Sequence, residues 1–164
     1  MSKNDQSNLH LDTADKLKFK KLYNVSRETI GKLETYKKYL LLANKQFNLI
    51  GRGTEKLVWS RHFADSAKLF VLIKNQLEEK PKKLSICDIG SGAGFPGVII
   101  KILSMDLNLD CNIELFESNK RKASFLEGLA KKLKLNIIIN NFRVENSAQN
   151  YDIVLSRAVA SLLN

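Results

Sequence analysis

This 164-residue sequence is most informative at Asp88-Ile89-Gly90-Ser91-Gly92-Ala93-Gly94-Phe95-Pro96-Gly97, a stretch that holds four of its eight glycines. The short apolar run Leu84–Ile89 precedes the glycines, and a helical pattern over Pro96–Ser104 follows them. A strand, a turn and a helix with proline near its start are typical of one unit of a parallel sheet. So many glycines let the backbone approach a ligand where any Cβ would collide, and the helix N–H groups point toward that ligand. The stretch therefore predicts a ligand site at the end of a strand.

Strands and helices alternate after this turn. The residue pattern predicts a strand over 111–117, a helix over 120–133, and strands over 135–140 and 151–156. Strands that alternate with helices indicate a doubly wound parallel sheet. We therefore expect an α/β fold in a Rossmann-like cofactor-binding region over 84–164.

Two helices are expected upstream, in a basic N-terminal helical region over 1–83. Residues 1–24 are polar and rich in lysine, and we expect them to fray. Ser26 is predicted to cap a helix whose apolar residues recur at spacings of three and four up to Phe47. Thr54 is predicted to cap a second helix that runs out before Pro81.

Charge is unevenly distributed along the chain. Residues 1–84 hold 18 Lys and Arg against 9 Asp and Glu, which gives +9, whereas residues 85–164 carry only +1. A basic half beside a neutral half suggests that one part of the molecule faces a polyanion. The abundance of Lys, Asn and Ile also fits an AT-rich genome, so charge alone leaves both interpretations open.

Composition excludes several other classes. Apolar residues make up 44% and charged residues 27% of the chain, which is ordinary for a soluble folded protein. No apolar run is long enough for a membrane span, and the N-terminus lacks the apolar core of a signal peptide. Cys87 and Cys111 form no metal-binding or disulfide pattern. We expect a cytoplasmic monomer with no metal ion and no membrane partner.

A carboxylate after the second predicted strand indicates the kind of ligand. Glu117 would lie beside the glycine-rich turn Gly90–Gly97, called the glycine turn below, and can accept both hydroxyls of a ribose. Gly92–Gly97 also fits the dinucleotide fingerprint, so a dinucleotide oxidoreductase is an alternative. Against it, Pro96 removes an N–H group that would meet pyrophosphate, and Asp88 suits a cation. S-adenosylmethionine is cationic and lacks phosphate, and we predict that Asp88, Gly90, Gly92, Gly94 and Glu117 bind it.

Five further motifs follow the order and spacing of one family. They are Phe47-Asn48-Leu49, Arg61-His62-Phe63-Ala64-Asp65-Ser66, Glu117-Ser118 with Lys120-Arg121 and Phe125-Leu126, Arg143-Val144-Glu145, and Ser156-Arg157-Ala158. With Asp88–Gly97, they resemble the bacterial 16S rRNA guanine-N7 methyltransferases, the glucose-inhibited division protein B family. The resemblance covers about residues 26–163.

That resemblance implies a class I S-adenosylmethionine-dependent methyltransferase with an N-terminal helical extension and a sheet order that starts 3-2-1-4. It implies cofactor contacts at Gly90, Phe95, Val144, Glu145 and Arg157. The substrate would be N7 of a guanine in the 530 loop of 16S rRNA, free or in the small ribosomal subunit. The family's chain continues beyond the fourth strand, so we expect a sheet that is incomplete at its C-terminal side. A truncated, inactive remnant that binds RNA or cofactor is the alternative.

The chemistry would need no catalytic side chain. Guanine N7 has a free lone pair, so its attack on a sulfonium methyl group requires no general base, and positioning supplies up to about 7–11 kcal/mol. His62 is accordingly predicted to be a packed or hydrogen-bonded structural residue rather than a base.

Overall fold

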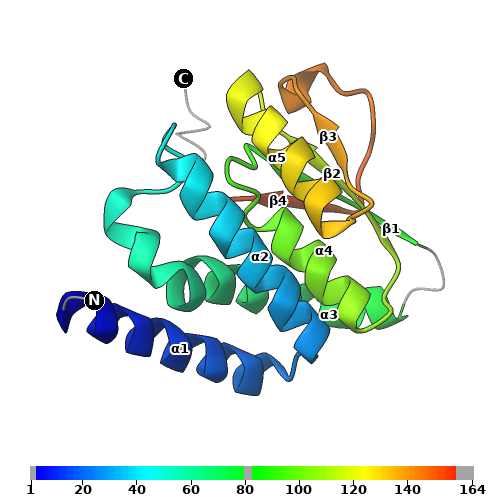
Figure 1. Ribbon diagram of the computed structural model, residues 1–164. Coiled ribbons are helices and arrows are strands. Elements are labelled where there is room, and N and C mark those ends of the chain that lie inside the picture. Colours follow the sequence, from blue (N-terminus) through cyan, green and yellow to red (C-terminus); the bar gives the residue numbers. More distant parts are fainter. Residues whose placement is uncertain (1–2, 80–82, 158–164) are drawn as a thin grey trace.

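Four parallel strands form the centre of the computed structural model, which describes residues 3–79 and 83–157 (Figure 1). The strands are β1 (Leu84–Ile89), β2 (Cys111–Phe116), β3 (Ile138–Asn140) and β4 (Ile153–Ser156). Their order in the sheet is β3-β2-β1-β4. The predicted α/β class and strand order are thus confirmed.

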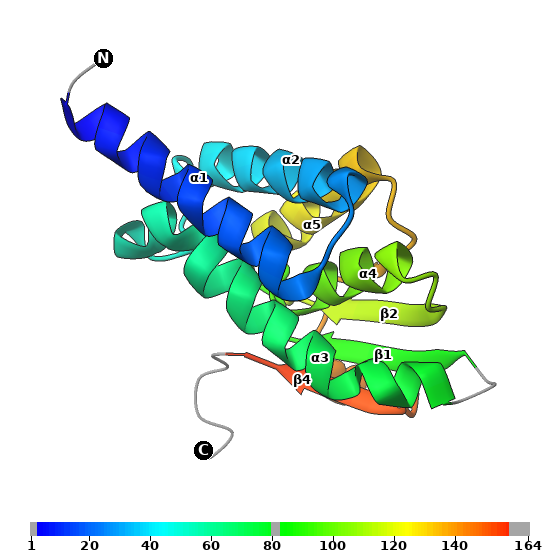
Figure 2. The ribbon, with the colours of Figure 1, turned by 90° about the horizontal axis from the view of Figure 1, so that it is seen from below.

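The longer helices lie in layers over the sheet. They are α1 (Lys3–Tyr23), α2 (Arg27–Asn44), α3 (Ala64–Glu79), α4 (Gly97–Asp106) and α5 (Lys120–Leu133). Helices α4 and α5 lie against the sheet, α2 crosses them on the outside, and α1 is outermost (Figures 1 and 2). The helical region therefore packs directly on the α/β region, and α2 contacts both α4 and α5.

Helix α4 is the most deeply buried helix, because it lies between the sheet and α2. Every residue from Gly97 to Ser104 is buried, as expected for a helix that is covered on all sides. Even Lys101 is only 7% exposed, and its ammonium donates to the Cys111 carbonyl oxygen at 2.8 Å. This core holds the turn before α4 rigidly in place.

The strand register brings four chain positions to one edge of the sheet. Ile89 of β1 is aligned with Phe116 of β2 and with Ser156 of β4, and Phe116 is aligned with Asn140 of β3. All four strands are parallel, so they end at the same edge. Ligands of open α/β sheets bind outside this edge.

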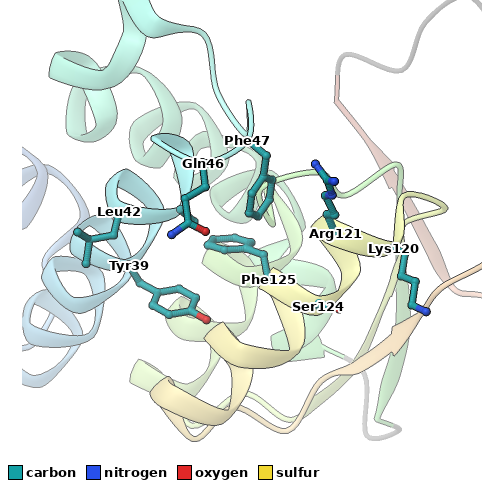
Figure 3. Close-up of a pocket in the computed structure, with 9 residues that line it drawn as sticks. Tyr39, Leu42, Gln46, Phe47, Lys120, Arg121, Ser124 and Phe125 are labelled. Atoms are coloured by element: carbon teal, nitrogen blue, oxygen red, sulfur yellow. The ribbon is translucent and has the colours of Figure 1, made fainter.

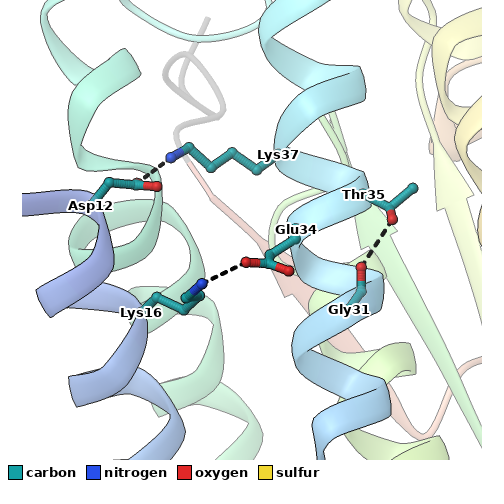
Figure 4. Close-up of polar contacts among 6 residues, drawn as sticks. All are labelled: Asp12, Lys16, Gly31, Glu34, Thr35 and Lys37. Atoms are coloured by element: carbon teal, nitrogen blue, oxygen red, sulfur yellow. Dashed lines mark hydrogen bonds and ion pairs between the residues drawn. The ribbon is translucent and has the colours of Figure 1, made fainter. Parts of the chain in front are cut away.

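The prediction that residues 1–24 fray is wrong for Lys3–Tyr23, which form α1. Phe19 is 3% exposed and packs edge-on against Trp59, with ring centroids 5.6 Å apart. Two ion pairs also join α1 to α2: Lys16 to Glu34 at 2.6 Å, and Asp12 to Lys37 (Figure 4). Tertiary contacts thus order a helix whose own sequence shows little periodicity.

The start of α2 is as predicted, because the Ser26 hydroxyl accepts a hydrogen bond from the Thr29 N–H group at 3.1 Å. The next helix differs from the prediction. It consists of the 3₁₀ helix η1 (Arg52–Leu57), the π-helical η2 (Val58–Phe63) and then α3. Gly51 is its N-cap, while the Thr54 hydroxyl donates to the Gly51 carbonyl oxygen at 2.8 Å instead of capping the helix.

Candidate cofactor site

The glycine turn begins at the edge where the strands end. The N–H groups of Gly90 and Ser91 both donate to the carbonyl oxygen of Phe116, at 2.9 and 3.1 Å. Gly90, Gly92 and Gly94 have φ values of +66°, +58° and +94°. An L-residue with a side chain rarely adopts these conformations. Glycine is therefore required by the path of the backbone itself.

Gly92 and Gly94 face different surroundings. A Cβ on Gly94 would lie 2.6 Å from Val98 Cγ2 and 2.8 Å from Tyr36 Oη, so this position packs against the protein. A Cβ on Gly92 would meet only the Gly90 carbonyl oxygen, at 3.7 Å. The space left by Gly92 is therefore open to a ligand, whereas the space left by Gly94 is filled by α2 and α4.

Glu117 follows β2 directly and is held against the turn. One carboxylate oxygen accepts from the Gly92 N–H group and the other from the Asn119 N–H group, both at 2.8 Å. The side chain is only 7% exposed, so it is not a solvated strand-end acid. Each carboxylate oxygen can accept a second hydrogen bond. Glu117 thus combines a fixed position with spare acceptor capacity, which suits a ribose.

Asp88 lies beneath the turn and is fully buried. One of its oxygens accepts from the Gly97 N–H group at 2.9 Å, and among the described residues the other, Oδ1, is buried without a partner. Burial raises the pKa of this carboxyl to about 7, although the hydrogen bond from Gly97 opposes the shift. An unsatisfied buried acceptor lowers stability. A cationic ligand group nearby would compensate for that loss.

Phe95, His62 and Arg157 form a stacked cluster beside the turn. The ring of Phe95 stacks on His62, with centroids 5.1 Å apart, and on Tyr36, with centroids 5.4 Å apart. The Arg157 guanidinium carbon is 4.8 Å from the Phe95 ring centroid. Arg157 follows β4, so this cluster joins the end of the fourth strand to the turn after the first.

Hydrogen bonds determine the tautomer of His62. The Thr54 hydroxyl uses its proton for the Gly51 carbonyl oxygen and therefore accepts from His62 Nε2–H at 2.8 Å. The free lone pair on Nδ1 then accepts from the Arg157 guanidinium at 3.2 Å. Burial and the neighbouring Arg157 lower the pKa of His62 to about 4, so the ring stays neutral at physiological pH. His62 thus positions Arg157, in agreement with the structural role that we predicted.

Contacts bring together Asp88, the glycine turn, Phe95, Glu117 and Arg157, but they do not include Val144 and Glu145. These two residues begin the short 3₁₀ helix η3 (Val144–Asn146), where Val144 is half-buried and Glu145 is exposed. Their role toward a cofactor stays a prediction.

Two residues that were not predicted also shape this site, Asn119 and Asn141. Asn119 is the N-cap of α5, and its side chain accepts from the Arg121 and Lys122 N–H groups. Asn141 follows β3, and its amide donates to the carbonyl oxygens of Glu117 and Ser118, at 2.8 and 3.2 Å. The signal for Asn141 was its place after a strand, the same signal that identified Glu117.

A parallel sheet of order 3-2-1-4, with a glycine turn after the first strand and a carboxylate after the second, defines the Rossmann-like class of folds, which methyltransferases share with dinucleotide-binding proteins. Within that class, residues 29–164 match the model of the GidB family, described as rRNA small subunit methyltransferase G. The chain belongs to this family. The family and its methyltransferase class are the predicted ones.

Similar proteins carry the name "Ribosomal RNA small subunit methyltransferase G". The protein from Cereibacter sphaeroides (strain ATCC 17025) is 39% identical over 92% of this chain and 70% of its own length. The protein from Orientia tsutsugamushi (strain Ikeda) is 40% identical over 85% of this chain and 65% of its own length. The protein from Rhodospirillum centenum is 40% identical over 88% and 62% of the two chains. The chain thus spans about two thirds of these relatives.

Two structural observations bear on partners. In the part of the chain that the structure describes, no helix is long and apolar enough to cross a lipid bilayer. Over the same residues, no three His, Cys, Asp or Glu side chains gather as they would around a metal ion.

Proposed function

We propose that this chain transfers the methyl group of S-adenosylmethionine to N7 of a guanine in the 530 loop of 16S rRNA. The observation that carries the proposal is Glu117, a buried carboxylate that is fixed against the open face of the Gly92 turn at 2.8 Å. Family membership supports the enzyme class. An rRNA substrate, free or in the small ribosomal subunit, also fits the proposed cytoplasmic location.

Each residue of the site has a distinct part in this proposal. Glu117 accepts the ribose hydroxyls, and the backbone at Gly90 and Gly92 lines the bound cofactor closely. Asp88 has a pKa of about 7, and a cationic ligand group would favour its ionised form beneath the turn. Phe95 and Arg157 form the wall beside the turn, and His62 keeps Arg157 in place. By resemblance to the family, Val144 and Glu145 also contact the cofactor.

The chemistry needs little more than this arrangement. S-adenosylmethionine supplies an electrophilic methyl group on a sulfonium. The N7 lone pair forms the new N–C bond as the C–S bond breaks, and no proton has to be moved. The task of the protein is to align the two reactants, which can supply about 7–11 kcal/mol. His62, with a pKa near 4, has no proton-transfer role in this scheme.

A remnant that binds cofactor or RNA without methyl transfer is the second candidate. The chain spans 62–70% of the length of the relatives described above. In the described residues β4 pairs only with β1, so the sheet ends at β4. Both candidates have the same cofactor site, but only the first transfers the methyl group.

Methyl transfer from radiolabelled S-adenosylmethionine separates the two candidates. The acceptor is small ribosomal subunits from cells that lack this modification, and subunits that already carry it are the control. The proposal predicts label in 16S rRNA at a guanine of the 530 loop, in a form sensitive to the strand-cleavage chemistry specific for N7-methylguanine. Cofactor binding without any transfer would establish the remnant instead.

A further inference from the structure

A pocket between the end of α2 and the start of α5 has no role in the cofactor site described above. It has a volume of about 840 Å³, and Figure 3 shows the side chains that line it. We propose that it holds an unstacked nucleobase of single-stranded RNA, with Arg121 contacting the adjacent phosphate. This inference rests on the proposed function, because it describes a second contact with the same substrate.

Aromatic rings form the body of the pocket. Phe125 is 4% exposed, and the Tyr39 ring stacks on it with centroids 5.2 Å apart and planes 20° from parallel. Phe47 is half-buried and points into the same hollow from the loop after α2 (Figure 3). Every nucleobase has a π face, so aromatic platforms bind single-stranded RNA without strict sequence preference.

The α2–α5 contact fixes Tyr39 within the pocket. A Cβ on Gly128 of α5 would lie 2.3 Å from Tyr39 Oη, so the ring reaches its position only because residue 128 is glycine. Lys132 lies 6.0 Å from the centroid of the same ring. The aromatic wall is thus part of the folded structure and does not have to form when a ligand arrives.

Polar groups at the rim suit the edge and phosphate of a nucleotide. Gln46 and Ser124 line the pocket and are exposed, which leaves an amide and a hydroxyl for the hydrogen-bonding edge of a base. The exposed Arg121 extends toward Phe47, whereas Lys120 extends away from the pocket (Figure 3). None of the described residues that line the pocket is acidic. A guanidinium beside an aromatic pocket without carboxylates favours a phosphate.

The pocket is connected to the cofactor site by a short segment of chain. Glu117 accepts from the Asn119 N–H group at 2.8 Å, and the Asn119 side chain accepts from the Arg121 N–H group at 3.0 Å. In the segment 117–121, Glu117 is therefore the proposed ribose-binding residue and Arg121 the proposed phosphate-binding residue. RNA bound in the pocket would lie next to the methyl donor.

RNA binding by variants of the full chain tests the pocket. The probe is a fluorescently labelled single-stranded oligoribonucleotide with the 530-loop sequence, and fluorescence anisotropy gives its Kd. We expect Phe47→Leu to weaken binding about five- to a hundredfold, because it keeps an apolar side chain but removes the π face. Phe47→Trp keeps a π face and should bind as tightly as the original chain.

Charge variants test the phosphate contact separately. Arg121→Gln should weaken binding and reduce the slope of log Kd against log salt by about 0.7, the value for one phosphate on a single strand. The matched control is Lys131→Gln, which removes one charge near the other end of α5. That control should leave the Kd and the slope unchanged.

Three results would contradict the pocket proposal. Unchanged RNA affinity in Phe47→Leu would exclude a stacked base, and equal slopes for Arg121→Gln and Lys131→Gln would exclude a local phosphate contact. Dimerisation of the chain that Phe47→Leu abolishes would identify a second copy as the occupant. Titration with S-adenosylhomocysteine keeps the two proposals apart. All pocket variants should bind this ligand with the affinity of the original chain. Failure of the original chain to bind it would contradict the proposed function and not the pocket proposal.

Discussion

Asp88 destabilises the folded chain at neutral pH, because one of its carboxylate oxygens is buried without a partner among the described residues. Its pKa rises from 3.8 to about 7 on folding. Between these two pH values the unfolded carboxyl is ionised while the folded one keeps its proton. The unfolded state therefore binds fewer protons, and the free energy of unfolding falls as the pH rises through this window. The total loss is about 4 kcal/mol.

Asp88→Asn should remove that loss, because the amide imitates the protonated acid and still accepts from the Gly97 N–H group. We expect the variant to be more stable than the original chain at pH 8 and equally stable at pH 3, which lies below both pKa values. Urea unfolding at both pH values measures the difference. The opposing contribution of His62, whose pKa is lowered, cancels in this comparison. Equal stability of the two chains at pH 8 would show that burial of the ionised Asp88 carboxylate does not lower the free energy of unfolding.

Substitution of Gly92 should abolish cofactor binding, whereas substitution of Gly97 should mainly lower stability. Gly92 has φ of +58° but open space, so Gly92→Val adds about 1–2 kcal/mol of backbone strain and obstructs the ligand. A Cβ on Gly97 would lie 2.5 Å from Leu115 Cδ2 and 2.8 Å from Asp88 Oδ2, inside the core. Gly97→Ala should therefore lower the melting temperature more, whereas Gly92→Val should lose cofactor binding while it still folds. Cofactor binding by Gly92→Val at the original affinity would exclude this turn from the site.

At the scale of single elements, α1 depends on packing more than on its ion pairs. Phe19→Ala should reduce the free energy of unfolding by about 3–5 kcal/mol, because this ring is buried against Trp59. Lys16→Ala breaks a partly exposed ion pair with Glu34 and should cost less than about 1 kcal/mol. Chemical denaturation of both variants measures the two values. A larger loss for Lys16→Ala than for Phe19→Ala would reverse our account of this helix.

The elements around the site could be predicted from sequence, whereas the N-terminal ones could only partly be. Strand β1 and helix α5 match their predicted bounds because their apolar patterns are regular. Helix α1 could not be predicted, since its order comes from Trp59 and from ion-pair partners in α2. The break into η1 and η2 was also missed, although the residues that η2 buries include Trp59 and His62.

The site shows the same limit. Glu117 and Arg157 could be placed because each follows a strand whose end the fold class fixes. What the pattern could not show is the hydrogen-bonded chain from Thr54 through His62 to Arg157, which joins segments about a hundred residues apart. Nor could it show that Glu117 is held by the turn itself.

Because the turn holds Glu117, we expect Glu117→Ala to lose some stability as well as cofactor affinity.

At the scale of the whole molecule, a basic helical region packs against the α/β region. The candidate cofactor site lies at the edge of the sheet where the four strands end. Residues 1–84 account for +9 of the net charge of +10. Their helix α2 contributes Tyr36 to the Phe95 cluster and Tyr39 to the pocket beside α5. The helical region thus builds part of both sites in addition to carrying charge.

Calorimetric titration with S-adenosylhomocysteine, the demethylated cofactor product, tests the central claim most directly. Our account predicts one binding site in the original chain and a Kd weakened about ten- to a hundredfold in Glu117→Gln. Glutamine keeps one oxygen for the Gly92 N–H group but loses the charge that strengthens the ribose bonds. Absence of binding by the folded original chain, or an identical Kd in Glu117→Gln, would contradict the account.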